Sequence, residues 1–120
     1  MAVDPQTGIV YETEDRPTAG FYRFTPSEPG NLHAGGMLEM LKCRHITDLR
    51  TAISPGTSLD VQWVPIDEPT RRHAPGTQNE LGVFSQGAAQ GAAMFARLEG
   101  CWYGDGSIFL TATDGGHAHC

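Results

Sequence analysis

A short turn signal in the C-terminal part of the chain constrains the fold more than any other stretch. Asp105-Gly106 lies between an apolar run that contains Trp102 and Tyr103 and a second run, Ile108–Leu110. Asp-Gly between two such runs is the strongest local sign of a tight β-hairpin, because the glycine accepts the positive φ of a type I′ turn. Aromatic and β-branched residues suit a pleated strand. The sequence therefore predicts a hairpin within a mainly β protein.

The alternation around this turn places a carboxylate beside strands that look buried. The first strand is predicted to carry Leu98, Gly100 and Trp102 on one face and Glu99, Cys101 and Tyr103 on the other. The second strand is apolar on both faces, which is typical of a strand buried on both sides. A carboxylate in such a place is costly unless a cation neutralises it. For Glu99 that cation is either Arg97 or a metal ion, and the residues alone leave both open.

Further strands are predicted upstream, with turns every eight to twelve residues. They are a short run that begins at Ile9, then 21–25 and 36–42, with a turn at 26–30. Residues 60–66 alternate as a strand does, and Pro65 demotes this strand to an edge because proline cannot donate to a ladder. Trp63, Trp102 and Phe109 are expected in the core. Short strands separated by turns at this spacing are typical of β-sandwiches, β-barrels and β-propellers.

Between Thr77 and Phe95 the apolar residues recur every three or four positions instead of every two. This spacing predicts an inserted surface helix over about 77–95. Its apolar stripe would consist of Leu81, Phe84, Ala88, Ala92 and Phe95. Thr77 is the expected N-cap, with Glu80 completing a capping box. Three glycines within the stretch weaken the helix by roughly 1 kcal/mol each relative to alanine.

Composition excludes several classes of function. The net charge of −6 argues against nucleic acid or an anionic membrane as the partner. No apolar run approaches the ~20 residues that span a bilayer, and no signal peptide opens the chain. The three cysteines are odd in number and widely spaced, so they form neither a disulfide framework nor a zinc pattern, and free thiols are expected at Cys43, Cys101 and Cys120.

Three stretches resemble the PhoX-type alkaline phosphatases, which are secreted or periplasmic bacterial phosphomonoesterases. They are Ala2–Asp15, Ala19–Phe24 and Phe95–Gly116, and the helical region between them is similar more loosely. The resemblance implies a six-bladed β-propeller with calcium and iron in its central channel, where phosphate esters are hydrolysed. At 120 residues the chain would supply about two blades, as a single partial domain cut at both ends. An isolated chain of this kind is expected to be inactive.

The resemblance also implies roles for individual residues. Glu99, in the Arg-Leu-Glu-Gly segment, matches a metal ligand of the family. Glu14 and Asp15 match an acidic segment and are further candidate ligands, and Arg97 is a candidate phosphate contact. Cys43 and Cys101 do not match the family's cysteine ligand. The complete protein would be periplasmic or extracellular, and its partner would be a small phosphate ester.

Two other functions stay open at this point. A non-catalytic propeller that serves as an interaction module would keep the hydrophobic pattern while its acidic positions changed. A calcium-dependent propeller hydrolase of the lactonase type would share the channel carboxylates but act on lactones and carboxylic esters. The arginine and glutamate of 97–100 argue mildly against the first.

Overall fold

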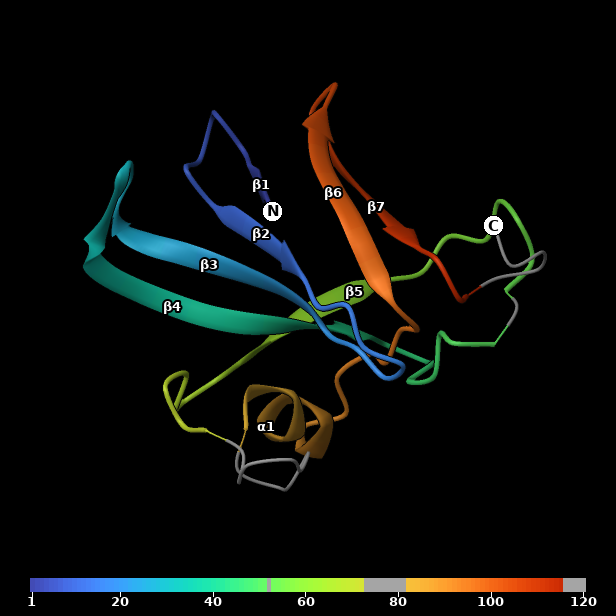
Figure 1. Cartoon of the computed structure of the whole chain (residues 1–120). Helices are drawn as coiled ribbons and strands as arrows, with labels where there is room; N and C mark the ends of the chain where they lie inside the picture. Colours follow the sequence, from blue (N-terminus) through green and yellow to red (C-terminus); the bar gives the residue numbers. More distant parts are fainter. Residues whose placement is uncertain (52, 73–81, 116–120) are drawn as a thin grey trace.

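The strands of this protein form one five-stranded antiparallel sheet and one separate hairpin (Figure 1). The structure is a computed structural model that describes residues 1–120 except 52, 73–81 and 116–120. The sheet has the order β1 (Ala2–Val3), β2 (Val10–Thr13), β3 (Phe21–Glu28), β4 (Asn31–Cys43) and β5 (Val61–Pro65). The hairpin pairs β6 (Leu98–Gly104) with β7 (Ser107–Ala112), and α1 spans Val83–Ala89. The mainly β prediction is confirmed.

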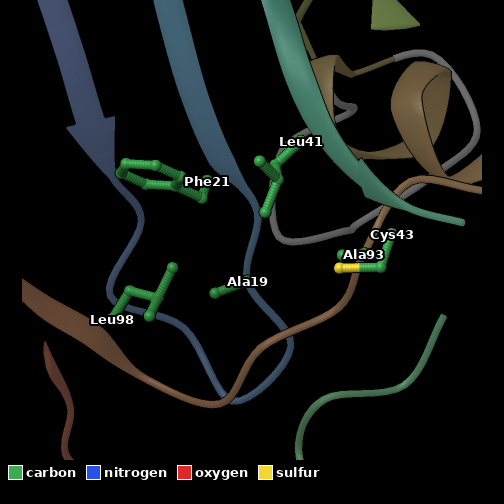
Figure 2. Close-up of a cluster of buried hydrophobic side chains, with 6 residues drawn as sticks. All are labelled: Ala19, Phe21, Leu41, Cys43, Ala93 and Leu98. Carbon is green, nitrogen blue, oxygen red and sulfur yellow. The ribbon is translucent and has the colours of Figure 1, made fainter. Parts of the chain in front are cut away.

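The hairpin and the helix lie on opposite faces of the sheet (Figure 1). Phe21 and Tyr22 are neighbours on β3 and therefore point to opposite faces. Phe21 belongs to a cluster that we call the hairpin-side core (Figure 2), which consists of Ala19, Phe21, Leu41, Cys43, Ala93 and Leu98. Tyr22 belongs to the helix-side core, which consists of Tyr22, Met40, Ile66 and Ala92, with Val83 and Phe84 of α1 packed against it.

The strands agree with the predicted positions, but two of them are longer. β3 continues through Pro26, where a turn was predicted, and the turn falls at Pro29-Gly30. β4 begins at Asn31 rather than at residue 36. Residues 31–37 are all exposed, so this extension is held by hairpin pairing and gives no burial signal in the sequence. β5 is an edge strand, as Pro65 indicated.

The helix is shorter than predicted. α1 covers only Val83–Ala89, and the expected capping residues Thr77 and Glu80, with Leu81, lie outside the described residues. The helix ends because Gly91 adopts a φ of 79°, and the Ala92 and Gly91 N–H groups bond to the Gly87 and Ala88 carbonyls at 3.1 and 2.9 Å. This is a Schellman motif, which stops a helix at a left-handed residue.

The segment after the helix is extended and buried, where a helical face had been predicted. Ala92 and Ala93 are fully buried, and the Ala93 N–H donates to the Leu41 carbonyl at 2.8 Å. Phe95 and Ala19 exchange both backbone hydrogen bonds, at 2.9 and 2.8 Å. The small side chains of Ala92 and Ala93 allow this close approach of the backbones, and Ala92 and Phe95 are the residues that extended the helical pattern in the sequence.

Gly87→Ala is expected to destabilise the protein, although alanine normally stabilises a helix interior by roughly 1 kcal/mol over glycine. A Cβ at Gly87 would overlap the Sδ atom of Met40 and lie 3.1 Å from its Cβ, and Met40 is fully buried. Overpacking of this kind costs about 1–3 kcal/mol, so the net effect should be unfavourable. Urea unfolding measures it. In a Met40→Ala background the same change should become neutral or stabilising, and the absence of such coupling would contradict the packing argument.

The hairpin prediction is confirmed at its turn and wrong in its burial. Asp105 and Gly106 have φ values of 48° and 74°, as a type I′ turn requires. Trp102 and Phe109, however, are 49% and 46% exposed, and their rings stack on the outer face with centroids 5.5 Å apart. β7 alternates between exposed and half-buried residues, so only one of its faces contacts the core.

A β-bulge explains why the predicted faces of β6 were wrong. Leu98 pairs with Ala112 but Cys101 pairs with Leu110, so β6 has one residue more than β7 in this interval. The extra residue shifts the alternation. Leu98 and Cys101 consequently both face the hairpin-side core, while Trp102 faces outward. No described helix is long and apolar enough to cross a membrane.

Candidate carboxylate–arginine site

The candidate site lies where the hairpin begins, and Arg97 is its central residue. Arg97 precedes β6 and has a φ of 49°, in the left-handed region that residues other than glycine rarely adopt. Backbone hydrogen bonds hold it there. Its N–H donates to the Arg16 carbonyl at 2.8 Å, and its carbonyl accepts from the Thr113 N–H at 2.9 Å and from the Thr113 hydroxyl at 3.3 Å. The conformation directs its side chain toward the end of β2.

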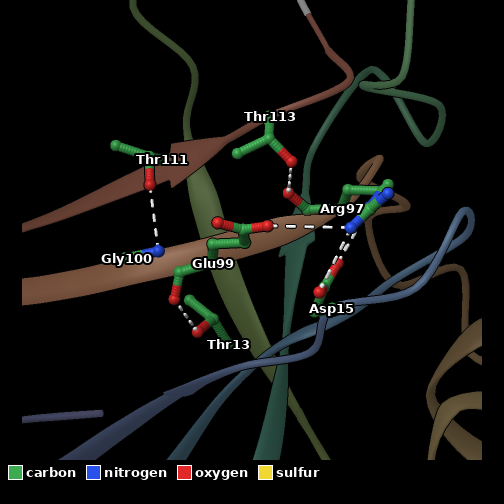
Figure 3. A network of polar contacts seen from close by, with 7 residues as sticks. All are labelled: Thr13, Asp15, Arg97, Glu99, Gly100, Thr111 and Thr113. Atoms are coloured by element: carbon green, nitrogen blue, oxygen red, sulfur yellow. Dashed lines mark hydrogen bonds and ion pairs between the residues drawn. The ribbon is translucent and has the colours of Figure 1, made fainter.

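Two carboxylates converge on the Arg97 guanidinium (Figure 3). Arg97 Nε and Nη2 donate to the two oxygens of Asp15 at 3.0 and 3.4 Å, and Nη2 lies 3.7 Å from Glu99 Oε1. All three side chains are about half exposed. Hydrogen bonding to Asp15, with smaller contributions from the charges of Glu99 and Asp114, raises the pKa of Arg97. Arg97 therefore remains a cation surrounded by negative charge.

Glu99 sits on the bulge of β6, which is held from both sides. The Thr13 hydroxyl of β2 donates to the Glu99 carbonyl at 2.8 Å. The Gly100 N–H donates to the Thr111 hydroxyl oxygen of β7 at 2.9 Å. These contacts use the backbone of the bulge, so they leave the Glu99 carboxylate available to solvent. The expectation of a carboxylate beside strands buried on both sides is corrected, because the bulge places Glu99 outside the core.

Glu14 points to a different set of partners. Its Oε2 accepts hydrogen bonds from the Gly20 N–H and from the Tyr22 hydroxyl, both at 3.1 Å, and Oε1 lies 3.7 Å from Arg16 Nε. Burial, and then the neighbouring Glu14 charge, raise the pKa of Tyr22, so the phenol keeps its proton and remains a donor. Glu14 thus anchors β2 to β3 rather than joining Asp15 at Arg97.

Of the four residues singled out in the sequence, the structure brings Asp15, Arg97 and Glu99 together and holds Glu14 apart. The pairing of Asp15 with Arg97 was missed, because 82 positions separate the two residues and no local spacing relates them. Across the described part of the chain, no three His, Cys, Asp or Glu residues are grouped so that they could hold a metal ion. Cys43 and Cys101 are free thiols, as expected, and Cys120 lies outside the described residues.

Fold and site together define a mainly β protein with an exposed arginine held between carboxylates at the start of a hairpin. Residues 1–119 match the family model described as alkaline phosphatase PhoX, and the chain therefore belongs to this family. The match confirms the resemblance carried by the two ends of the sequence. No curated protein and no solved structure matches the chain.

Proposed function

We propose that this chain serves in a metal-dependent phosphomonoesterase that hydrolyses small phosphate esters. Family membership over residues 1–119 supports the phosphatase class. The observation that carries the assignment of a site is the convergence of Asp15 and Glu99 on Arg97, from parts of the chain that are far apart in sequence. In this proposal Glu99 and Asp15 are metal ligands, Glu14 is a further ligand, and Arg97 contacts the phosphate.

The side chains fit a metal such as calcium in part. Carboxylate oxygens are the donors that Ca²⁺ prefers, and they also hold iron(III). Asp15 and Glu99 are half exposed and already gathered around a cation, so binding a metal would require little rearrangement of either one. Glu14 would have to leave Tyr22 and Gly20 to join them. Ca²⁺ takes six to eight oxygens, so these residues would provide only part of a coordination sphere.

The chemistry divides between the metal and the chain. Bound calcium and iron would polarise the phosphoryl oxygens and lower the pKa of a coordinated water. Arg97 would orient the phosphate, since a guanidinium fork matches two phosphate oxygens. Its hydrogen bonds to Asp15 fix the fork, and those from Thr113 fix the backbone beneath it. Thr13 keeps Glu99 at its place on the bulge.

We also infer an architecture and a cellular location for the complete enzyme. The strands would form part of a six-bladed propeller, because closing a ring of blades covers sheet edges such as those of β1 and β5. The complete enzyme would act in the periplasm or outside the cell, as its family resemblance implies. Calcium suits an extracellular enzyme, whose sites need only modest affinity.

A substrate panel tests the proposed function in the complete enzyme that carries this segment. We expect turnover of a chromogenic phosphomonoester, no turnover of a lactone, and loss of activity after chelation that returns with calcium and iron. Chelator-sensitive turnover of the lactone alone would replace the proposal with a lactonase. No turnover of either substrate by metal-loaded enzyme would favour a non-catalytic interaction module.

The 120-residue chain by itself is expected to show no metal-dependent phosphatase activity. Only two of the proposed carboxylate ligands converge among the described residues, and metal affinity depends on the whole ligand set. The measurement is turnover of the same phosphomonoester with calcium and iron supplied, beside a Glu99→Gln chain as the control. Turnover well above that control would show that the site is local to these residues.

A further inference from the structure

A second arginine, Arg23, lies in the middle of the sheet on the face that the hairpin covers. Arg23 on β3 stands directly opposite Tyr11 on β2 and Glu39 on β4, so the three side chains form a row across one face. Arg23 Nε donates to Glu39 Oε2 at 2.6 Å. Glu39 is only 7% exposed and is the one buried charged residue among those described.

The guanidinium of Arg23 stacks on the indole ring of Trp63 of β5. The Arg23 Cζ atom lies 4.5 Å from the centre of the Trp63 ring, the geometry of a cation–π contact. Trp63 is itself fixed by Tyr11 and Phe21, whose ring centroids lie 6.1 and 6.0 Å away. The Glu39 carboxylate, which accepts from Nε, and the Trp63 ring together fix the position and the plane of the Arg23 guanidinium.

The two Nη groups of the Arg23 guanidinium are free to bind a ligand. The two Nη groups of Arg23 make no hydrogen bond to any described residue, and no described side chain has a buried nitrogen or oxygen without a partner, so both groups reach solvent. Arg50 provides the contrast. Its Nε and Nη2 bond to the Asp48 carboxylate at 2.9 and 2.7 Å, and its Nη1 bonds to Thr18 at 2.9 Å, so it has no nitrogen to spare.

We propose that Arg23 binds an oxyanion, namely a phosphate group, through its two Nη groups. A buried ion pair is weak evidence for a role in stability, because desolvation can cost more than the attraction returns. A fixed arginine with two free parallel donors is, by contrast, the arrangement that takes two oxygens of a phosphate. The Tyr11 hydroxyl, on the neighbouring strand of the row, has no hydrogen-bond partner among the described residues and offers a further donor. Burial raises the pKa of Tyr11, so this donor keeps its proton.

The proposal deepens the proposed phosphatase function but does not depend on the metal ligands. Arg23 belongs to β3 and Arg97 to the start of the hairpin, and they have different carboxylate partners. Phosphate binding at Arg23 can therefore be measured on the metal-free chain. Failure of that measurement would leave the metal site and the hydrolysis assay untouched.

The experiment uses the fluorescence of Trp63 as the reporter. The chain has two tryptophans, so Trp102→Phe, which preserves the exposed aromatic stack with Phe109, leaves Trp63 as the single emitter. This chain is titrated with inorganic phosphate and, separately, with phenyl phosphate, in EDTA and at constant ionic strength. We expect a saturable change in emission. Arg23→Lys, which keeps the charge but not the fork, should weaken binding roughly tenfold, the equivalent of one charge-assisted hydrogen bond.

Two matched controls make the outcome decisive. Arg50→Lys should leave the affinity unchanged, because every nitrogen group of Arg50 is already engaged. Arg97→Lys separates the two arginines, since a loss of affinity there and none with Arg23→Lys would overturn the proposal in favour of Arg97. No saturable change with either ligand in the Trp102→Phe chain would also overturn it, whether or not the Arg23 variant folds. Saturation that Arg23→Lys weakens supports it, and a comparison of inorganic phosphate with the monoester shows whether free phosphate or an ester is preferred.

Discussion

Leu98→Ala is expected to lower the free energy of unfolding by about 3 to 5 kcal/mol, the upper part of the range for leucine truncations in a core. Leu98 is fully buried and packs in the hairpin-side core with Ala19, Phe21 and Ala93 (Figure 2). Ala19 and Phe21 come from β3 and the loop just before it, and Ala93 from the segment after α1, so no single element can move to fill the cavity. Total stabilities are about 5–15 kcal/mol, so this one change would remove a large share.

Leu32→Ala is the matched control for this prediction. Leu32 lies on β4 and is 53% exposed, so the same chemical change should cost less than about 0.5 kcal/mol. Urea unfolding followed by circular dichroism measures both variants. Equal small costs at the two positions would mean that the hairpin does not pack on the sheet as the structure shows.

Glu99→Gln is expected to lower phosphatase activity and bound metal together in the complete enzyme. Loss of a partner that only orients a ligand costs 10–100-fold, so loss of a ligand should cost about 100-fold or more. The fold should survive, because Thr13 and Thr111 hold the bulge through its backbone and not through the carboxylate. The pair that Glu99 makes with Arg97 is half exposed, and pairs of that kind contribute at most about 1 kcal/mol.

Glu12→Gln provides the control for charge alone. Glu12 is an exposed carboxylate on β2, three residues before Asp15, and its removal should change neither quantity. Metal analysis and steady-state assay of the same preparations are the measurements. Unchanged metal content in Glu99→Gln would contradict the ligand role and leave the ion pair with Arg97 as the account of this residue.

The parts of the fold that were predicted correctly depend on local chemistry. The Asp105-Gly106 turn needs two residues with positive φ, and that requirement is visible in the two residues themselves. Pro65 marks an edge strand because a proline cannot donate to a ladder, whatever surrounds it. Family membership was likewise visible in the sequence, since it rests on ordered matches at the two ends of the chain.

The parts that were predicted wrongly depend on contacts between distant segments. Ala92 and Phe95 fit a helical stripe, but Gly91 ends the helix. Ala92 is instead buried in the helix-side core, and the backbone of Phe95 pairs with Ala19 in the loop before β3. Trp102 was expected in the core as part of an apolar strand. The bulge on β6 changed the alternation, and Gly100 within the strand was the one sequence signal for it, because a glycine inside a strand often marks a bulge.

Three things could be predicted from the order of residues alone: a mainly β protein of the PhoX family, its hairpin and edge strand, and the residue types of its candidate site. These follow from backbone preferences and from order along the chain. Which carboxylates share a cation depends on how distant segments pack together. Asp15 reaches Arg97 while the adjacent Glu14 reaches Tyr22, because successive residues at the end of a strand point in opposite directions. The partner that each finds depends on which distant strand packs there.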